Sequence, residues 1–126
     1  MCFYVPKRQR IKIAENDITC YKIVEVCSNT KTLRSQFLGF FYNFKETYKI
    51  KKEFPQYKKV DLITKSKRVI DKGFHSYIEM SYSHRSHFPS NFTKIVECII
   101  PKGSKYHVNE EMNEYVSESI KIIKLL

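Results

Sequence analysis

Histidine and cysteine are the side chains of this sequence that could bind a metal or act as nucleophiles. His75, His84, His87 and Cys98 are metal-ligand types, and the spacing His84-x-x-His87 would place two imidazoles on one face of a helix. Zinc sites in small domains usually show a second clear pair of ligands, and this sequence has none. We therefore expect no metal site. A Cys–His nucleophile pair stays open, although the sequence indicates no third group that would orient the histidine.

The four cysteines, at positions 2, 20, 27 and 98, include no Cys-x-x-Cys pair. A disulfide framework is not expected in a chain that is not secreted. Cys20 and Cys98 fall inside predicted strands, where a free thiol behaves as a small apolar side chain. We expect both to be buried and free, with a reactive thiol as the alternative.

Lys22 lies on an otherwise apolar strand face. In the segment ITCYKIVEV (residues 18–26), Lys22 shares one face with Cys20, Val24 and Val26. If that face is the core, the ammonium must extend to water, form a pair or line a cleft, because an isolated buried charge is costly. The sequence leaves these three alternatives open.

The formal charge of +10 is concentrated in two basic clusters. The C-terminal part carries an acidic patch instead, made of Glu110, Glu111, Glu114 and Glu118. A basic surface attracts polyanions and binds them in a salt-sensitive way, but it can equally be a solvated surface that keeps the protein soluble. The first cluster contains Lys7, Arg8, Arg10 and Lys12, and the second contains Lys51, Lys52, Lys58, Lys59, Lys65, Lys67, Arg68 and Lys72.

Phosphate-binding glycine loops are missing. The chain has three glycines and neither the P-loop nor the dinucleotide-binding fingerprint. Aromatic residues alternate with basic ones around residues 40–57. This pattern is typical of platforms that stack single-stranded bases, and also of strand faces that pack into a core.

Alternating apolar residues predict the elements that must position these groups. The run Thr93–Ile100 places Val96, Cys98 and Ile100 on one face and is typical of a central strand. Residues 18–26 form a second strong strand, and Tyr77–His87 is a candidate short helix. We predict a single α+β domain over residues 1–126, with a mostly antiparallel or mixed sheet and one or two short helices. Residues 1–16 are expected to form an extended arm or edge strand, and further strands are expected at 38–44 and 117–125. Residues 60–63 and 68–70 are expected to form weak strands or one broken hairpin, and residues 105–108 a short strand or loop.

The sequence offers no signal for a membrane. No run approaches the roughly 20 apolar residues that a transmembrane helix needs, and the basic N-terminal segment is not followed by an apolar stretch of signal-peptide length. We therefore expect a cytoplasmic protein that does not bind membranes.

The order of several motifs resembles a family of small uncharacterised proteins of Bacteroides-type bacteria and their phages. The motifs are MCFYVPK, DITCYKIVEV, KGFHSY, VECIIPKGSKYHVNE and EYVSESIKII, and the similarity covers nearly the whole chain. The resemblance implies a compact intracellular domain of a phage or mobile element, which acts in the host cytoplasm if a phage encodes it. It implies no particular activity.

A weaker similarity is to the ADP-ribosyltransferase core. Lys22, Ser76 and Glu118 occupy the relative places of that family's basic residue, its Ser-Thr-Ser motif and its catalytic glutamate. The resemblance implies that Lys22 and Ser76 position NAD and that Glu118 stabilises an oxocarbenium-like centre. The chain departs from the family in having Lys for Arg or His, and His-Ser-Tyr for Ser-Thr-Ser.

Two functions follow as hypotheses. The first is a non-enzymatic accessory protein that needs no cofactor and binds an acidic partner, such as a nucleic acid, or a host protein. The second is an NAD-binding transferase, or its inactive relative, with Lys22, Ser76 and Glu118 as catalytic residues. The residues assigned to binding are Tyr21, Lys51, Lys52, Lys58, Lys59, Arg68, His75 and Tyr77.

Overall fold

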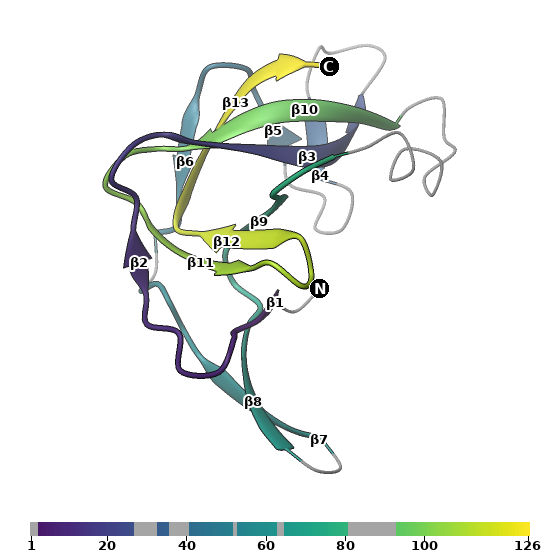
Figure 1. Cartoon of the computed structure of the whole chain (residues 1–126). Coiled ribbons are helices and arrows are strands. Elements are labelled where there is room, and N and C mark those ends of the chain that lie inside the picture. Colours follow the sequence, from purple (N-terminus) through teal and green to yellow (C-terminus); the bar gives the residue numbers. More distant parts are fainter. Residues whose placement is uncertain (1–2, 27–32, 36–40, 52, 63–64, 81–92) are drawn as a thin grey trace.

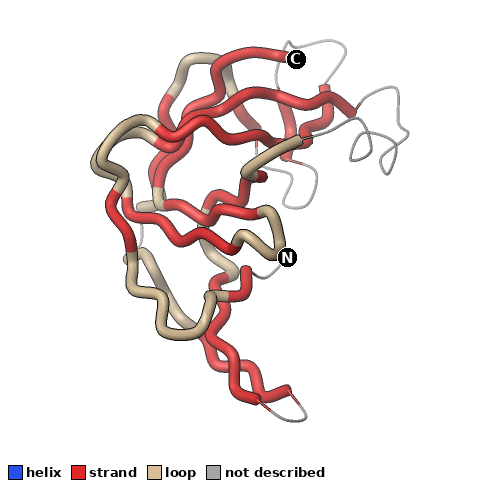
Figure 2. Tube along the Cα trace, viewed as in Figure 1, coloured by secondary structure: helices blue, strands red, loops and turns tan. Residues whose placement is uncertain are grey.

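A computed structural model describes residues 3–26, 33–35, 41–51, 53–62, 65–80 and 93–126 (Figure 1). All regular elements in these residues are strands, and Figure 2 shows no helix among them. The strands are β1 (Phe3–Tyr4), β2 (Lys12–Ile13), β3 (Ile18–Val26), β4 (Leu33–Ser35), β5 (Phe41–Tyr42), β6 (Thr47–Lys49), β7 (Lys58–Leu62), β8 (Lys65–Ile70), β9 (Phe74–Tyr77), β10 (Thr93–Ile100), β11 (Lys105–Asn109), β12 (Glu114–Ser117) and β13 (Ser119–Leu125).

The predicted α+β class is wrong. The described part of the chain is all-β, and both of its sheets are antiparallel. Tyr77, the expected start of a helix, is the last residue of β9; residues 78–80 are not helical, and the rest of the expected helix lies outside the described residues. The physical reason lies in composition and pairing. The chain has one alanine but fourteen isoleucines, and the aromatic segment Phe74–Tyr77 gains a complete ladder with β12.

The two strongest predicted strands lie side by side at the centre of the larger sheet. β3 and β10 pair antiparallel over eight positions, from Thr93 opposite Glu25 to Ile100 opposite Ile18. β10 pairs on its other edge with β13, with a register shift between Glu97 and Cys98. The strand order is β2-β11-β12-β9-β3-β10-β13-β6, and β4 pairs with β3 and with β5.

The larger sheet curves so that its two halves enclose the main core. β3 and β10 lie across the top in Figure 1, and β11 and β12 lie below them. Between these layers pack residues whose side chains point to the inner face, as period-2 alternation requires. They are Ala14, Cys20, Val24, Val96, Cys98, Ile100, Ile120 and Ile122, with Phe74, Tyr106 and Tyr115 at their edge.

A smaller sheet covers the other face of β12. Its strand order is β1-β8-β7, and a second core forms from Phe3, Val5, Phe54, Ile70 and Val116. The segments expected at residues 60–63 and 68–70 correspond to β7 and β8, which pair antiparallel over five positions and project from the body of the molecule (Figure 1). The N-terminal segment joins the two sheets, because β1 pairs with β8 and β2 pairs with β11.

Candidate functional site

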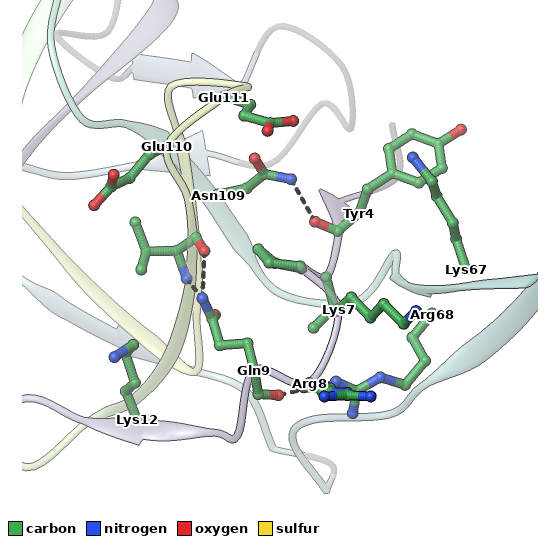
Figure 3. Close-up of a pocket in the computed structure, with 13 residues that line it drawn as sticks. Tyr4, Lys7, Arg8, Gln9, Lys12, Lys67, Arg68, Asn109, Glu110 and Glu111 are labelled. Carbon is green, nitrogen blue, oxygen red and sulfur yellow. Dashed lines mark hydrogen bonds between the residues drawn. The ribbon is translucent and has the colours of Figure 1, made fainter.

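A groove of about 890 Å³ lies between the N-terminal segment, β8 and the end of β11 (Figure 3). The turn after β11 contributes two carboxylates, Glu110 and Glu111. Among the described residues, no carboxylate forms an ion pair with any of the groove's cationic side chains. These cations are Lys7, Arg8, Lys12, Lys67 and Arg68.

A tight turn places Arg8 in the wall of the groove. The backbone N–H of Gln9 donates to the carbonyl of Pro6 at 3.0 Å. Arg8 has a φ of 64°, in the left-handed region, which costs a residue with a Cβ roughly 1–2 kcal/mol. Residues held in this region often lie at functional sites.

The side-chain amide of Gln9 holds this segment against β11 as a strand backbone would. Its Nε2 donates to the carbonyl of Val108 at 2.9 Å, and its Oε1 accepts from the N–H of Val108 at 3.1 Å. The same oxygen lies 2.8 Å from Nδ1 of His107. Because an amide oxygen only accepts, Nδ1 of His107 carries the proton. A further hydrogen bond holds the segment: the Nδ2 of Asn109 donates to the carbonyl of Tyr4 at 2.7 Å.

His107 is fully buried and neutral. Its Nε2 accepts a hydrogen bond from the hydroxyl of Tyr57 at 2.7 Å. Burial, with smaller effects from Arg68 and Lys12, lowers the pKa of His107 to about 4. The imidazole is therefore a structural link between Gln9 and Tyr57 at neutral pH.

Two of the cations of β8, Lys67 and Arg68, are held in place by aromatic rings. The guanidinium of Arg68 lies 4.9 Å from the ring centroid of Tyr57, and its Nη2 donates to the carbonyl of Gln9 at 2.9 Å. The ammonium of Lys67 lies 5.6 Å from the ring centroid of Tyr4. Both cations keep donors for an anion, because neither contact neutralises the charge.

Lys22 is buried and paired with the backbone. Its Nζ donates to the carbonyl of His75, close to the point where β9 makes its one register pair with β3, Tyr21 opposite Tyr77. Burial lowers the pKa of Lys22, and Cys98, Cys20 and Glu114 partly offset this effect. Of the three alternatives for Lys22, the structure shows pairing.

The structure brings Ser76 close to Lys22 but places Glu118 elsewhere. The β3–β9 register sets Ser76 beside Lys22. Glu118 lies at the bend between β12 and β13, after the end of the ladder in which Tyr115 is the register partner of Ser76. Its Oε1 accepts from the backbone N–H of Lys105 at 3.0 Å. The carboxylate whose charge reaches Lys22 is that of Glu114.

Several buried polar atoms near Lys22 have no hydrogen-bond partner. They include both ring nitrogens of His75, the hydroxyl of Ser76 and Oε2 of Glu114. Burial, followed by the charge of Lys22, lowers the pKa of His75 to about 4, and burial raises the pKa of Glu114. The imidazole of His75 is therefore neutral at neutral pH, and burial disfavours the charged form of Glu114, which suits an interior better than a site that binds a charged ligand.

The other predicted site residues lie in several places. Arg68 lines the groove, Lys59 and Lys51 are exposed, and Lys58 forms an ion pair of 2.5 Å with Asp71. Tyr21 and Tyr77 are half-buried neighbours, while Lys52, His84 and His87 lie outside the described residues.

Cys20 and Cys98 stand opposite each other in the β3–β10 ladder. Both are free and fully buried, as predicted. Burial raises the pKa of Cys98 well above its ordinary value. No group of three or more His, Cys, Asp or Glu side chains in the described part of the chain could hold a metal ion, and no helix there is long and apolar enough to cross a bilayer.

Comparison of the chain with protein-family models, curated proteins and solved structures gives no match. The resemblances to phage-type proteins and to the transferase core therefore stay predictions. The geometry of the groove is what the functional argument rests on. Gln9 and Asn109, which build it, were not among the predicted site residues, because a lone amide carries no sequence signal of its distant partner.

Proposed function

We propose that this protein is a non-enzymatic binding protein whose basic groove takes a polyanion, and that the polyanion is a nucleic acid. The observation that supports this most is the set of five cations around one groove, none of which is paired with a carboxylate in the part of the chain that the structure describes. Like charges held together raise the free energy of the empty site. A bound polyanion would lower this free energy, and the counterions condensed on the polyanion would be released.

A nucleic acid fits this groove better than an isolated anion. The cations come from the Pro6–Gln9 turn, from β2 and from β8, so they are spread along the groove. A sugar–phosphate backbone offers charges at regular intervals along a line, and arginine and lysine are its usual partners. The net charge of +10 would also speed the approach of such a partner. We place this role in a phage or mobile element, acting in the host cytoplasm, as the family resemblance implies.

The test is the salt dependence of binding to a labelled 20-base-pair DNA, measured by fluorescence anisotropy between 50 and 200 mM salt. Five phosphate contacts would give a slope of log K against log salt of about −4.5. We expect Lys7→Gln combined with Lys12→Gln to reduce the slope by about two and the affinity at 100 mM by roughly tenfold.

The matched control is Lys49→Gln combined with Lys102→Gln, which removes the same charge at exposed positions outside the groove. We expect this control to keep more than half of the affinity. An affinity that does not change with salt, or an equal loss in the two double variants, would contradict a site in the groove.

A further inference from the structure

Among the described residues, the outer part of β7 and β8 is a two-stranded ribbon that pairs with no third strand. The two strands pair over five positions, from Lys58 opposite Val69 to Leu62 opposite Lys65. β1 pairs only with Val69 and Ile70, at the inner end of β8. Figures 1 and 2 show the ribbon projecting from the body of the molecule. Isolated two-stranded ribbons are marginally stable, so packing alone does not account for this projection.

The ribbon is strongly basic. Lys59 stands opposite Arg68, and Lys67 stands opposite Val60. Because successive residues of a strand point to opposite faces, Lys67 and Arg68 place cations on both faces of the ribbon. The strands β7 and β8 carry Lys58, Lys59, Lys65, Lys67 and Arg68, against the single carboxylate of Asp61.

The basic groove and the ribbon form one continuous surface. Lys67 and Arg68 belong to β8 and also line the groove. Arg68 is held by the ring of Tyr57 and by the carbonyl of Gln9, so the base of the ribbon is fixed relative to the N-terminal segment. A partner seated in the groove therefore meets the ribbon as well.

We propose that the β7–β8 ribbon enters the major groove of double-stranded DNA while the basic groove holds the adjacent phosphates. This inference rests on the proposed function and names its partner. The major groove of B-form DNA is about 12 Å wide and admits a two-stranded ribbon, whereas the major groove of duplex RNA is too narrow. Phosphates line both walls of that groove, and the ribbon carries cations on both faces. A single strand offers no such pair of walls.

The first experiment compares a 20-base-pair duplex DNA with single-stranded DNA and duplex RNA of the same sequence at 100 mM salt. We expect duplex DNA to bind at least tenfold tighter than the other two. The ribbon variant Lys59→Gln/Lys65→Gln should weaken duplex DNA binding roughly tenfold and reduce its salt slope by about two. It should leave single-strand binding within twofold, and Lys49→Gln/Lys102→Gln should change neither. Thermal melting of each variant checks that it is folded.

The second experiment is methylation of the bound duplex by dimethyl sulfate. We expect the protein to protect guanine N7, in the major groove, and not adenine N3, in the minor groove. Protection of adenine N3 alone, tighter binding to single strands or to duplex RNA, or an unchanged duplex affinity in the ribbon variant would overturn the inference.

Different experimental results would contradict the groove function and the ribbon inference. If the groove variant Lys7→Gln/Lys12→Gln loses affinity and the ribbon variant does not, the groove function stands and the ribbon inference is wrong. If no nucleic acid binds in a salt-dependent way, both are wrong.

Discussion

At the scale of single residues, Lys22 shows how a charge can stay inside this fold. Its neighbours on the strand face are Cys20 and Val24, and it is 8% exposed. The ammonium donates to the carbonyl of His75, close to the single register pair that joins β9 to β3. Hydrogen bonding offsets part of the desolvation cost, and the lowered pKa reflects the remainder.

Lys22→Met should change how stability responds to alkaline pH. The folded-state pKa of Lys22 lies below 10.5, so its contribution to stability grows as pH rises toward 10.5 and is lost as pH falls through the folded pKa. We expect the wild type to gain stability relative to Lys22→Met between pH 7 and pH 10, measured by urea unfolding at three pH values. The tyrosines and cysteines are present in both proteins, so their titration largely cancels in the difference between the two free energies of unfolding. A constant difference would contradict the burial of a charged ammonium.

The buried histidines predict a loss of stability in mild acid. The pKa values of His75 and His107 are about 4 in the folded protein and about 6.5 when unfolded, so both favour folding above pH 6.5 and cease to do so as pH falls to 4. Each contributes a slope of up to about 1.4 kcal/mol per pH unit in this window. We expect His107→Gln to remove about half of the slope seen in urea unfolding from pH 6.5 to 4.5. The same slope in both proteins would show that His107 does not titrate with folding.

At the scale of elements, the N-terminal segment is held by side chains more than by strand pairing. β1 and β2 have two residues each, yet Gln9 and Asn109 add several hydrogen bonds between this segment and β11. One amide of Gln9 satisfies Val108 and His107 together. The groove therefore depends on that side chain, although Gln9 itself carries no charge.

Gln9→Leu should release the segment. The change leaves the backbone groups of Val108 and the Nδ1–H of His107 without partners in a part-buried place, which costs about 2–3 kcal/mol. We expect a corresponding fall in the urea midpoint. Arg10→Ala, at the exposed neighbouring position, should stay within about 0.5 kcal/mol of wild type. Equal stability of the two variants would contradict the role of Gln9 in holding the N-terminal segment against β11.

Gly73 packs closely against β12 and Phe54, so that its position leaves no space for a side chain. A Cβ at position 73 would lie 2.5 Å from Cγ2 of Val116 and 3.0 Å from Cε2 of Phe54. We expect Gly73→Ala to cost about 1–3 kcal/mol, because both neighbours belong to the second core. Combining it with Val116→Ala should cost less than the sum of the two single changes, since the smaller side chain removes the closest contact. Additive costs in a double-mutant cycle would show that the contact is not the cause.

At the scale of the whole molecule, the buried cores and the positive charges lie in different parts of the fold. The cores gather around β3, β10 and β12, whereas cations occupy the N-terminal segment and the ribbon. Such a division leaves a rigid body that presents a basic surface, because the charged segments need not take part in the main core.

Hydrogen exchange should show this division directly. We expect the slowest amide exchange in β3 and β10, whose eight register pairs lie in the middle of the larger sheet. Amides in the outer half of β7 and β8 should exchange much faster, because only two strands support them. Exchange measured by NMR or mass spectrometry at neutral pH tests this. Protection of the ribbon equal to that of β10 would show that it has support from another part of the chain.

The sequence by itself determined the strands that carry the main core and the excess of positive charge. Alternation along residues 18–26 and 93–100 is a local, period-2 property, and it correctly places Cys20, Cys98 and Ile100 in the interior. It did not exclude the short helix expected after Tyr77, because a few serines and aromatics have no decisive local preference. Pairing with β12 made Tyr77 the last residue of a strand, and residues 78–80, which follow it, are not helical.

Only the tertiary structure decided which distant groups meet. Gln9 and His107 are 98 residues apart, and Glu114, rather than Glu118, is the carboxylate whose charge reaches Lys22. Such contacts depend on strand order, register and the curvature of the sheet. These are set by the packing of all strands together, so no stretch of the sequence encodes them alone.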